Sequence, residues 1–506
     1  LLLWANSRLA FAIGADFGAD VYRRTLYQPY QTHLARNSSE LISAITTKTR
    51  SAVWALHAML TVVSSTVLLF AILFALVAID PVMVAIAAIV LGSSYGIITR
   101  TSRRRLETNS RRVARESVKV IKALQEGLGG IRDVLLNGAQ PVFCETYEKA
   151  NFVLQRAESS SLFIGTSPRP AMEAVGIVMI SGLAYYGLNR QAGGVATALP
   201  VLGALAMGAQ RLLPALQQLY ANWVSIVSNR VALAEVLDLL DQPLPEETFT
   251  PDPPPLEFSQ SIIFESVFFR YLDNGPWVLN GLNLSMPKGL RIGLVGETGT
   301  GKSTALDIMM GLLEPTRGVI LVDGVPVNGE RRRSWQRAIA HVPQSIFLAD
   351  TTLAENIAFG VSPKEIDMQR VRKAALQAQI ADFVESGPDG YQALIGERGI
   401  RLSGGQRQRI GIARALYRQA SVLVLDEATS SLDNTTEQSV MEAIEALDRD
   451  LTIVIIAHRL STVQRCDQII ELAHGKVIAQ GTYEELLEKS PSFRQMAMVV
   501  AEHSLR

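Results

Sequence analysis

Two pairs of long apolar stretches limit how this chain can fold more than any other feature of its sequence. Residues 51–79 and 82–98 form the first pair around Asp80-Pro81, and residues 171–188 and 195–213 form the second around a short polar segment. Each stretch approaches or exceeds the ~20 residues that a helix needs to cross a bilayer. Two tight apolar hairpins do not fit a soluble domain, so the first half of the chain is predicted to be a membrane-embedded helical bundle.

Composition agrees with this prediction. Hydrophobic residues make up 48% of the 506 residues and the mean hydropathy is +0.19, which is high for a soluble protein. The 48 basic and 48 acidic residues balance, so the net charge indicates no nucleic-acid partner. The spacing of Cys144 and Cys466 fits neither a metal site nor a disulfide framework, which favours two reduced cytosolic thiols.

Basic residues predict the orientation of the helices. Arginines follow the second apolar stretch at positions 100, 103, 104, 105, 111, 112 and 115, and such clusters stay on the cytoplasmic side of a membrane. Both hairpin tips then lie outside, and the chain after residue 213 lies inside. Counting backwards, residues 1–20 cross from outside to inside, so an earlier span is expected to precede Leu1.

The segments between the apolar stretches are polar and helix-forming over long distances. Residues 21–50 and 99–169 contain few prolines or glycines, so they are predicted to be helices that project into the cytosol. Turns are expected where each projection reverses, near residues 37–39 and 137–141. These projections are either plain helical stalks or levers that touch a cytoplasmic partner domain.

Two charged residues interrupt the second apolar pair. Glu173 and Arg211 fall at similar distances from the hairpin tip, and charge inside a membrane is costly enough to indicate a function. One interpretation is an ion pair between neighbouring helices. The other is that Arg211 contacts an anionic head group of a transported molecule.

A proline-rich segment ends the membrane half. Residues 242–255 contain six prolines and several acids, a composition typical of a semi-rigid spacer. The pattern after this segment is that of a soluble α/β domain.

A phosphate-binding loop lies near the start of that domain. Residues 291–295 form a short buried-strand pattern, and a G-x4-G-K-S motif follows, with a helix expected from Thr304. The motif consists of Gly296, Glu297, Thr298, Gly299, Thr300, Gly301, Lys302 and Ser303. In such loops backbone N–H groups surround the phosphates, the lysine reaches the β and γ oxygens, and the serine ligates Mg²⁺.

Two further buried strands lead into residues that can coordinate a metal, activate water or contact a phosphate. Residues 422–425 lead into Asp426, placed to coordinate a metal, and Glu427, placed to polarise an attacking water. Residues 452–456 form the other strand pattern and lead to His458, placed to sense a γ-phosphate.

A second phosphate cradle lies about a hundred residues after the first. Leu402, Ser403, Gly404, Gly405 and Gln406 open a helix, where backbone N–H groups and a hydroxyl can meet a phosphate. A single nucleotide does not need two cradles from one fold. This redundancy predicts that two copies of the chain share their ATP.

Taken together, these motifs resemble an ATP-binding cassette domain over residues 256–487. The resemblance assigns Lys302 as the Walker A lysine, residues 402–406 as the signature, Asp426 as the Walker B acid and Glu427 as the catalytic glutamate. It further implies a switch histidine at His458, a glutamine at Gln344 that contacts Mg²⁺, an adenine-stacking ring at Tyr271, and a D-loop at residues 431–433 whose Asp433 contacts ATP in trans.

The membrane half resembles that of ABC exporters of the fused half-transporter kind. The implied fold is an all-α transmembrane bundle lacking its first helix (residues 1–241), a linker (242–255) and an α/β P-loop cassette domain (256–506). In that family the two cytoplasmic turns are coupling helices that dock on the ATPase. The resemblance implies a homodimer in the inner membrane with cytoplasmic cassettes, using ATP and Mg²⁺.

The expected cargo is an amphipathic lipid-linked saccharide. Residues 167–173 and 211–214 are similar to segments of bacterial lipid-linked oligosaccharide flippases and polysaccharide exporters, where basic cavity residues engage a pyrophosphate, a role that would suit Arg211. The alternatives are a lipid A or multidrug exporter, a non-transport ABC ATPase, and a membrane-tethered ATP sensor. A sensor that does not hydrolyse ATP could dispense with Glu427.

Overall fold

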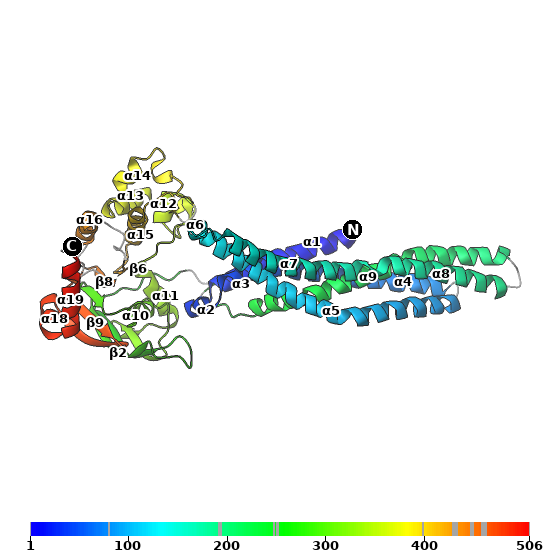
Figure 1. Cartoon of the computed structure of the whole chain (residues 1–506), viewed down its shortest axis with the longest axis horizontal. Helices are drawn as coiled ribbons and strands as arrows, with labels where there is room; N and C mark the ends of the chain where they lie inside the picture. The colour runs from blue at the N-terminus through cyan, green and yellow to red at the C-terminus, as the bar shows by residue number, and fades with distance from the viewer. Residues whose placement is uncertain are drawn as a thin grey trace. The chain divides into compact units, whose positions relative to one another are not determined.

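The computed structural model describes most of the chain, namely residues 2–78, 81–190, 195–245, 248, 252–396, 399–427, 434–445, 450–456 and 463–504. The chain divides into two compact units. The first comprises Leu1–Gln28 and Thr32–Thr248, and the second comprises Pro29–Gln31 and Phe249–Arg506. Long helices build the first unit and two β-sheets flanked by helices build the second (Figure 1).

Long helices dominate the described part of the first unit. They are α1 (Leu2–Leu26), α4 (Thr49–Val77), α5 (Pro81–Gly129), α7 (Gln140–Thr166), α8 (Pro168–Arg190) and α9 (Val195–Leu240). Shorter elements join them: α2 (Tyr30–Ala35), α3 (Ser38–Ser43), a π-helical turn (Ala44–Lys48) and α6 (Ile131–Leu136). The helices of this unit pack lengthwise, with α4 against α9 and α5 against α7 (Figure 1).

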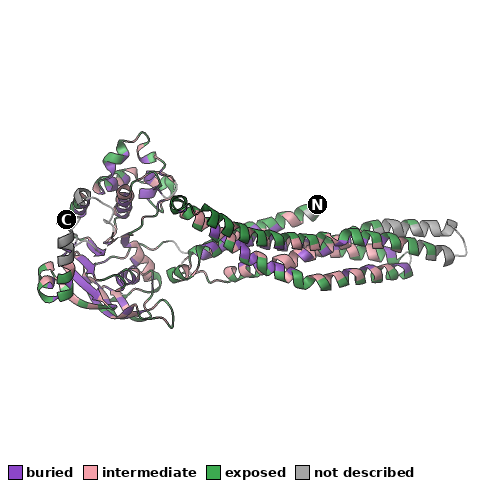
Figure 2. Ribbon diagram, in the orientation of Figure 1, coloured by how far each residue is buried: buried purple, intermediate pink, exposed green. Residues whose placement is uncertain are grey.

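Two helical segments meet the requirements for membrane spans. Ser38–Val77 and Pro81–Gly129 are long and apolar enough to cross a bilayer, judged by length and composition among the described residues. Large apolar side chains on α4 face outward, and Phe74 is 80% exposed. Figure 2 shows exposed residues along the outside of these long helices, whereas buried residues line the strands of the second unit. Outward apolar side chains are expected where lipid replaces water as the solvent.

Both predicted turns of the polar projections are present. Asn37 caps α3 by accepting a 3.0 Å hydrogen bond from the Ser39 N–H. In the other projection α6 ends at Leu136, Gly138 has a φ of +61°, and α7 begins at Gln140. Helix α5 continues without a break from the apolar stretch into the polar projection, as the sequence predicts.

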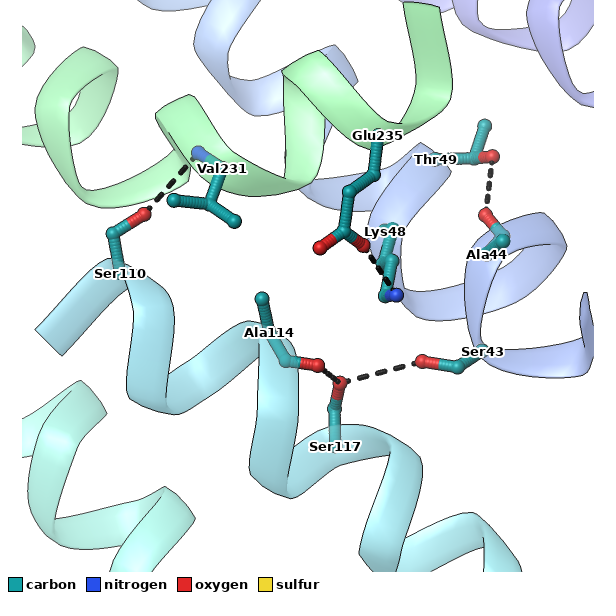
Figure 3. A network of polar contacts seen from close by, with 9 residues as sticks. All are labelled: Ser43, Ala44, Lys48, Thr49, Ser110, Ala114, Ser117, Val231 and Glu235. Carbon is teal, nitrogen blue, oxygen red and sulfur yellow. Dashed lines mark hydrogen bonds and ion pairs between the residues drawn. The ribbon is translucent and has the colours of Figure 1, made fainter. Parts of the chain in front are cut away.

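Polar contacts tie three segments of the first unit together, in the polar projections that adjoin the predicted spans. Lys48, at the end of the π-helical turn, forms an ion pair with Glu235 of α9 (Figure 3). The hydroxyl of Ser110 on α5 accepts a 3.3 Å hydrogen bond from the backbone N–H of Val231 on α9. Ser117 of α5 lies 3.3 Å from the hydroxyl of Ser43. These contacts join the segment just before α4 to α5 and α9.

A six-stranded sheet organises the second unit, in the order β10-β9-β3-β8-β7-β6. The strands are β3 (Arg291–Val295), β6 (Ile339–Val342), β7 (Val422–Asp426), β8 (Thr452–Ile456), β9 (Gln468–Ala473) and β10 (Lys476–Gly481). All neighbouring pairs are parallel except β9 and β10. Parallel strands are apolar throughout because helices cover both faces, and β7 and β8 are buried over nearly their full length.

A second, antiparallel sheet and several helices complete this unit. The sheet has the order β2-β1-β4-β5, with β1 (Ser261–Phe269), β2 (Leu279–Pro287), β4 (Arg317–Val322) and β5 (Val325–Pro326). The helices are α10 (Lys302–Met309), α11 (Gly329–Arg337), α12 (Leu353–Ile357), α13 (Met368–Gln377), α14 (Ala381–Glu385), α15 (Gly404–Arg418), α16 (Asn434–Glu445), α18 (Tyr483–Lys489) and α19 (Pro491–Ser504).

The order of the parallel strands places the functional residues. Because β3, β8, β7 and β6 are parallel neighbours, their carboxyl ends meet at one edge of the sheet. The predicted strands at 291–295 and 452–456 match β3 and β8, whereas β7 extends one residue further to include Asp426. Helix α10 begins at Lys302, two residues before its predicted start at Thr304.

Candidate functional site

The phosphate-binding loop connects β3 to α10. Gly296 and Gly301 have φ values of +145° and +97°, in the region that favours glycine. A Cβ atom at Gly296 would lie 2.2 Å from the backbone oxygen of Leu472, so no larger residue fits there. The loop therefore keeps its backbone close to β9, and α10 starts directly from it with its first N–H groups unpaired within the helix.

The side chain of Lys302 folds back into this loop. Its ammonium donates hydrogen bonds to the backbone oxygens of Gly296 at 2.7 Å and Glu297 at 2.8 Å, and the residue is only 7% exposed. Burial lowers the pKa of Lys302, and the carboxylates of Glu427 and Asp426 oppose that change by favouring the charged form. The loop, its lysine and the two acids at the carboxyl end of β7 thus share one electrostatic environment.

Glu427 is held at the end of β7 in an unusual backbone conformation. Its φ is +49°, a value that non-glycine residues rarely adopt. Its N–H donates a 3.1 Å hydrogen bond to the backbone oxygen of Ile456 on β8. The side-chain amide of Gln344, which follows β6, donates a 2.6 Å hydrogen bond to Glu427 Oε2. The predicted Gln344 and Glu427 therefore meet directly.

The residues predicted to hold Mg²⁺ offer a suitable set of donors. Ser303 supplies a hydroxyl at the start of α10, Asp426 a carboxylate at the tip of β7, and Gln344 an amide. Because the amide nitrogen of Gln344 donates to Glu427, its oxygen remains for a cation. Hydroxyl, carboxylate and amide oxygens are the ligands that Mg²⁺ prefers.

Asp307 also belongs to this environment, and it is not among the residues predicted from the sequence. Burial raises the pKa of Asp307 to about 6, and the nearby Asp426 contributes to the rise. Asp307 follows Ser303 by four residues on α10, which puts both on one helix face. That spacing is the signal that could have identified it.

Tyr271 lies beside the start of α10. Its phenol oxygen is 3.1 Å from the hydroxyl of Thr304, and its ring meets the ring of Phe269 edge-on with centroids 5.0 Å apart. The residue is 41% exposed. A partly exposed ring fixed next to the phosphate-binding loop has the position that stacking on a base requires.

The second cradle forms the start of α15. The hydroxyl oxygen of Ser403 accepts a 3.2 Å hydrogen bond from the Gln406 N–H, and the Ser403 N–H donates a 2.8 Å hydrogen bond to Gln406 Oε1. This capping box leaves the Ser403 hydroxyl proton free to be donated. Within the described part of the chain, no hydrogen bond joins residues 402–406 to the loop at 296–304.

Two predicted residues cannot be placed. His458 and Asp433, with the rest of the predicted D-loop at 431–433, lie outside the described residues. Their assignments stay predictions.

Glu173 and Arg211 do not pair with each other as one interpretation proposed. Glu173 forms a 3.0 Å ion pair with Arg169, so the expected ion pair between Glu173 and Arg211 is wrong. The physical reason is proximity along α8, because residues four apart in sequence face each other on one helix. Arg211 is exposed, and among the described residues it takes part in no ion pair.

Comparison with known proteins agrees with the fold and site. Residues 279–430 match the family described as ABC transporter, and residues 4–200 match the ABC transporter transmembrane region. The ATP-dependent lipid A-core flippase of Thiobacillus denitrificans is 31% identical over 504 residues, covering 98% of this chain and 84% of that protein. The corresponding flippase of Cupriavidus metallidurans is 31% identical over 478 residues, covering 93% and 79%.

A solved structure extends the likeness to three dimensions. A bacterial Atm1-family ABC exporter with ATP bound superposes with a TM-score of 0.86 and 27% identity, covering 97% of this chain and 85% of that one. The fold and site define an ATPase fused to a membrane-spanning helical region. The chain belongs to the ABC transporter family, as an exporter of the fused kind. ATP hydrolysis by its cassette is coupled to transport across the membrane.

Proposed function

We propose that two copies of this chain form a transporter for a phosphorylated glycolipid and share two ATP molecules between their cassettes. The observation that carries the proposal is the presence of two phosphate cradles in one cassette. The loop at 296–304 and the start of α15 at 402–406 each present helix N–H groups. With no hydrogen bond between them in the described residues, each is available to a different chain's nucleotide.

Each ATP is bound by one chain's loop and the other chain's signature. The N–H groups of residues 296–304 and the ammonium of Lys302 hold the phosphates, while Tyr271 stacks on the adenine. Ser403 and its neighbours in residues 402–406 donate to the phosphates from the partner copy, and Asp433 is assigned to the same task. His458 is assigned to the γ-phosphate.

Hydrolysis depends on the acids at the end of β7. Glu427 accepts a proton from the attacking water, and Gln344 holds the carboxylate in place through its amide. Ser303, Asp426 and the amide oxygen of Gln344 would hold Mg²⁺, whose charge offsets that of the β and γ phosphate oxygens. Transport follows because ATP binds the closed pair of cassettes more tightly than the open pair, and hydrolysis removes that bias.

The chemistry of Arg211 supports an anionic cargo. It is an exposed cation within the apolar part of α9, and a guanidinium binds phosphate with two parallel hydrogen bonds. The relatives from Thiobacillus denitrificans and Cupriavidus metallidurans are named as lipid A-core flippases. Lipid A and lipid-linked oligosaccharides both combine lipid chains, sugar and phosphate, so this shared chemistry defines the proposed cargo.

We place the protein in the inner membrane with its cassette in the cytoplasm. The arginines of α5 that follow its apolar segment are exposed and cluster at positions 100, 103, 104, 105, 111, 112 and 115. Such a cluster supports a cytoplasmic location for that end of α5. The cassettes must also face the compartment that contains ATP.

Reconstitution into proteoliposomes tests the proposal. Lipid A-core, a lipid-pyrophosphate-linked oligosaccharide and an uncharged amphipathic drug are compared for stimulation of ATPase activity and for translocation. The proposal expects both phosphorylated glycolipids, or one of them, to be moved, with Arg211→Ala reducing stimulation and leaving basal ATPase unchanged. Transport of the drug alone, or equal stimulation of the Arg211→Ala variant, contradicts it.

A further inference from the structure

Gln408 contacts the end of β7, next to the predicted base Glu427. It lies on α15 and is 2% exposed. Its side-chain amide donates a 3.3 Å hydrogen bond to the backbone oxygen of Glu427. The backbone N–H of Glu427 donates a hydrogen bond to the backbone oxygen of Ile456 on β8. The peptide groups on both sides of Glu427 are therefore held by different elements, one by β8 and the other by α15.

The backbone of Glu427 needs such support. A φ of +49° is unfavourable for a residue with a Cβ and persists only where the surroundings hold it. Backbone conformation determines where a side chain points, and the carboxylate of Glu427 must remain beside Gln344. If the backbone relaxed to a negative φ, the carboxylate would leave this position.

We propose that Gln408 is a positioning residue for Glu427. By holding the backbone oxygen, it fixes the conformation in which the carboxylate lies beside Gln344 and can accept a proton from water. The inference rests on the proposed role of Glu427 as the base. This role gives α15 two functions. Ser403 of the signature caps the helix, and Gln408, five residues later, supports Glu427 of the same chain.

The test replaces Gln408 by methionine in the full-length chain. Methionine has a similar size and shape but cannot donate the hydrogen bond. We expect kcat for ATP hydrolysis to fall about 10-fold, because a small displacement of a general base has a large effect on rate. KM and the affinity for a non-hydrolysable ATP analogue should stay within about twofold of wild type, since no phosphate contact is removed. The melting temperature is measured in parallel.

A matched control separates positioning from packing. Gln336 also donates its side-chain amide to a backbone oxygen of the cassette, that of Gly311 at 2.9 Å, but away from β7. Gln336→Met should leave kcat unchanged. A Gln408→Met variant with wild-type kcat overturns the proposal, as does one whose kcat, analogue affinity and melting temperature fall together.

A double variant shows whether Gln408 acts through Glu427. With Glu427→Gln already present, adding Gln408→Met should slow ATP hydrolysis no further. A further tenfold loss in the double variant overturns the positioning role. Failure of the proposed function is distinguishable, because Glu427→Gln alone would then hydrolyse ATP at the wild-type rate.

Discussion

The side-chain amide of Gln344 and the carboxylate of Glu427 are joined by a 2.6 Å hydrogen bond, although 83 residues separate them in the sequence. Gln344 follows β6 and Glu427 directly follows β7, and these parallel strands are neighbours in the sheet. The bond connects a predicted metal ligand to the predicted base. A change at either residue should therefore affect the other.

Removing the amide of Gln344 should slow hydrolysis. In a Gln344→Ala variant the carboxylate of Glu427 loses the donor that orients it, so we expect kcat to fall about 10- to 100-fold. Affinity for ATP measured without Mg²⁺ should be unchanged, whereas the gain in affinity on adding Mg²⁺ should shrink. Isothermal titration with and without the ion provides the measurement. An unchanged kcat would show that the hydrogen bond between Gln344 and Glu427 does not contribute to catalysis.

The ring of Tyr271 and its hydroxyl should contribute separately to ATP affinity. Tyr271→Phe loses only the contact with Thr304 and keeps the stacking face, so ATP affinity should change by less than about twofold. Tyr271→Ala removes the face and should weaken ATP binding about 3- to 10-fold, because aromatic stacking contributes about 0.5–1.5 kcal/mol. Fluorescent-nucleotide titration checks both variants. Equal losses in the two would assign the effect to the hydroxyl.

Asp307 should make the protein less stable as the pH rises. Its folded pKa is about 6, above the ordinary 3.8, so the folded state holds the proton more tightly than the unfolded state does. The resulting loss of stability develops between about pH 4 and pH 6 and is complete above that range. Asp307→Asn should raise the melting temperature at pH 7.5, with the difference from wild type vanishing near pH 4. A difference that grows as the pH falls would contradict this assignment.

Removing Lys48 and removing Glu235 from their ion pair should destabilise the protein to different extents. The Lys48 side chain is 11% exposed and that of Glu235 is 40% exposed. Glu235→Gln leaves a largely buried ammonium without a counter-charge and should cost about 1–2 kcal/mol, whereas Lys48→Met leaves a carboxylate on a side chain that is 40% exposed and should cost less. Thermal melting in detergent ranks the variants. The opposite order would show that the carboxylate is the less well solvated partner.

Local patterns predicted the elements of this protein better than its side-chain contacts. The strands β3 and β8 match their predicted bounds because each is a short apolar run between polar residues. The apolar stretches at 51–79 and 82–98 correspond to helices α4 and α5 because each is a long apolar run that composition alone reveals. Helix α10 starts earlier than predicted because the fold begins it directly at the loop lysine, Lys302.

The contacts that escaped prediction depend on tertiary structure or on competition between partners. Glu173 and Arg211 carry opposite charges at similar depth, but Arg169 lies one helical turn from Glu173 and pairs with it instead. Gln408 looks like an ordinary helix residue in the sequence. Its role depends on α15 packing against the end of β7 and on the positive φ of Glu427, and neither is encoded in a local pattern.

Heterodimers of two differently disabled chains show whether each ATP lies between two chains. Lys302→Ala disables the loop and Ser403→Arg disables the signature, and both are placed in the Glu427→Gln background, which should retain ATP. Differently tagged variants are co-expressed and isolated as heterodimers. In such a dimer one site combines both defects, and the other combines an intact loop with an intact signature from the partner.

The measurement is the amount of ATP retained per dimer after gel filtration. A shared site predicts that the heterodimer retains ATP at its one intact site. A homodimer of either variant carries its defect at both sites and should retain none. If each chain instead formed its own site, every chain would be defective. Heterodimers that retain no ATP, beside a Glu427→Gln homodimer that retains it, would show that the ATP site is not shared between chains.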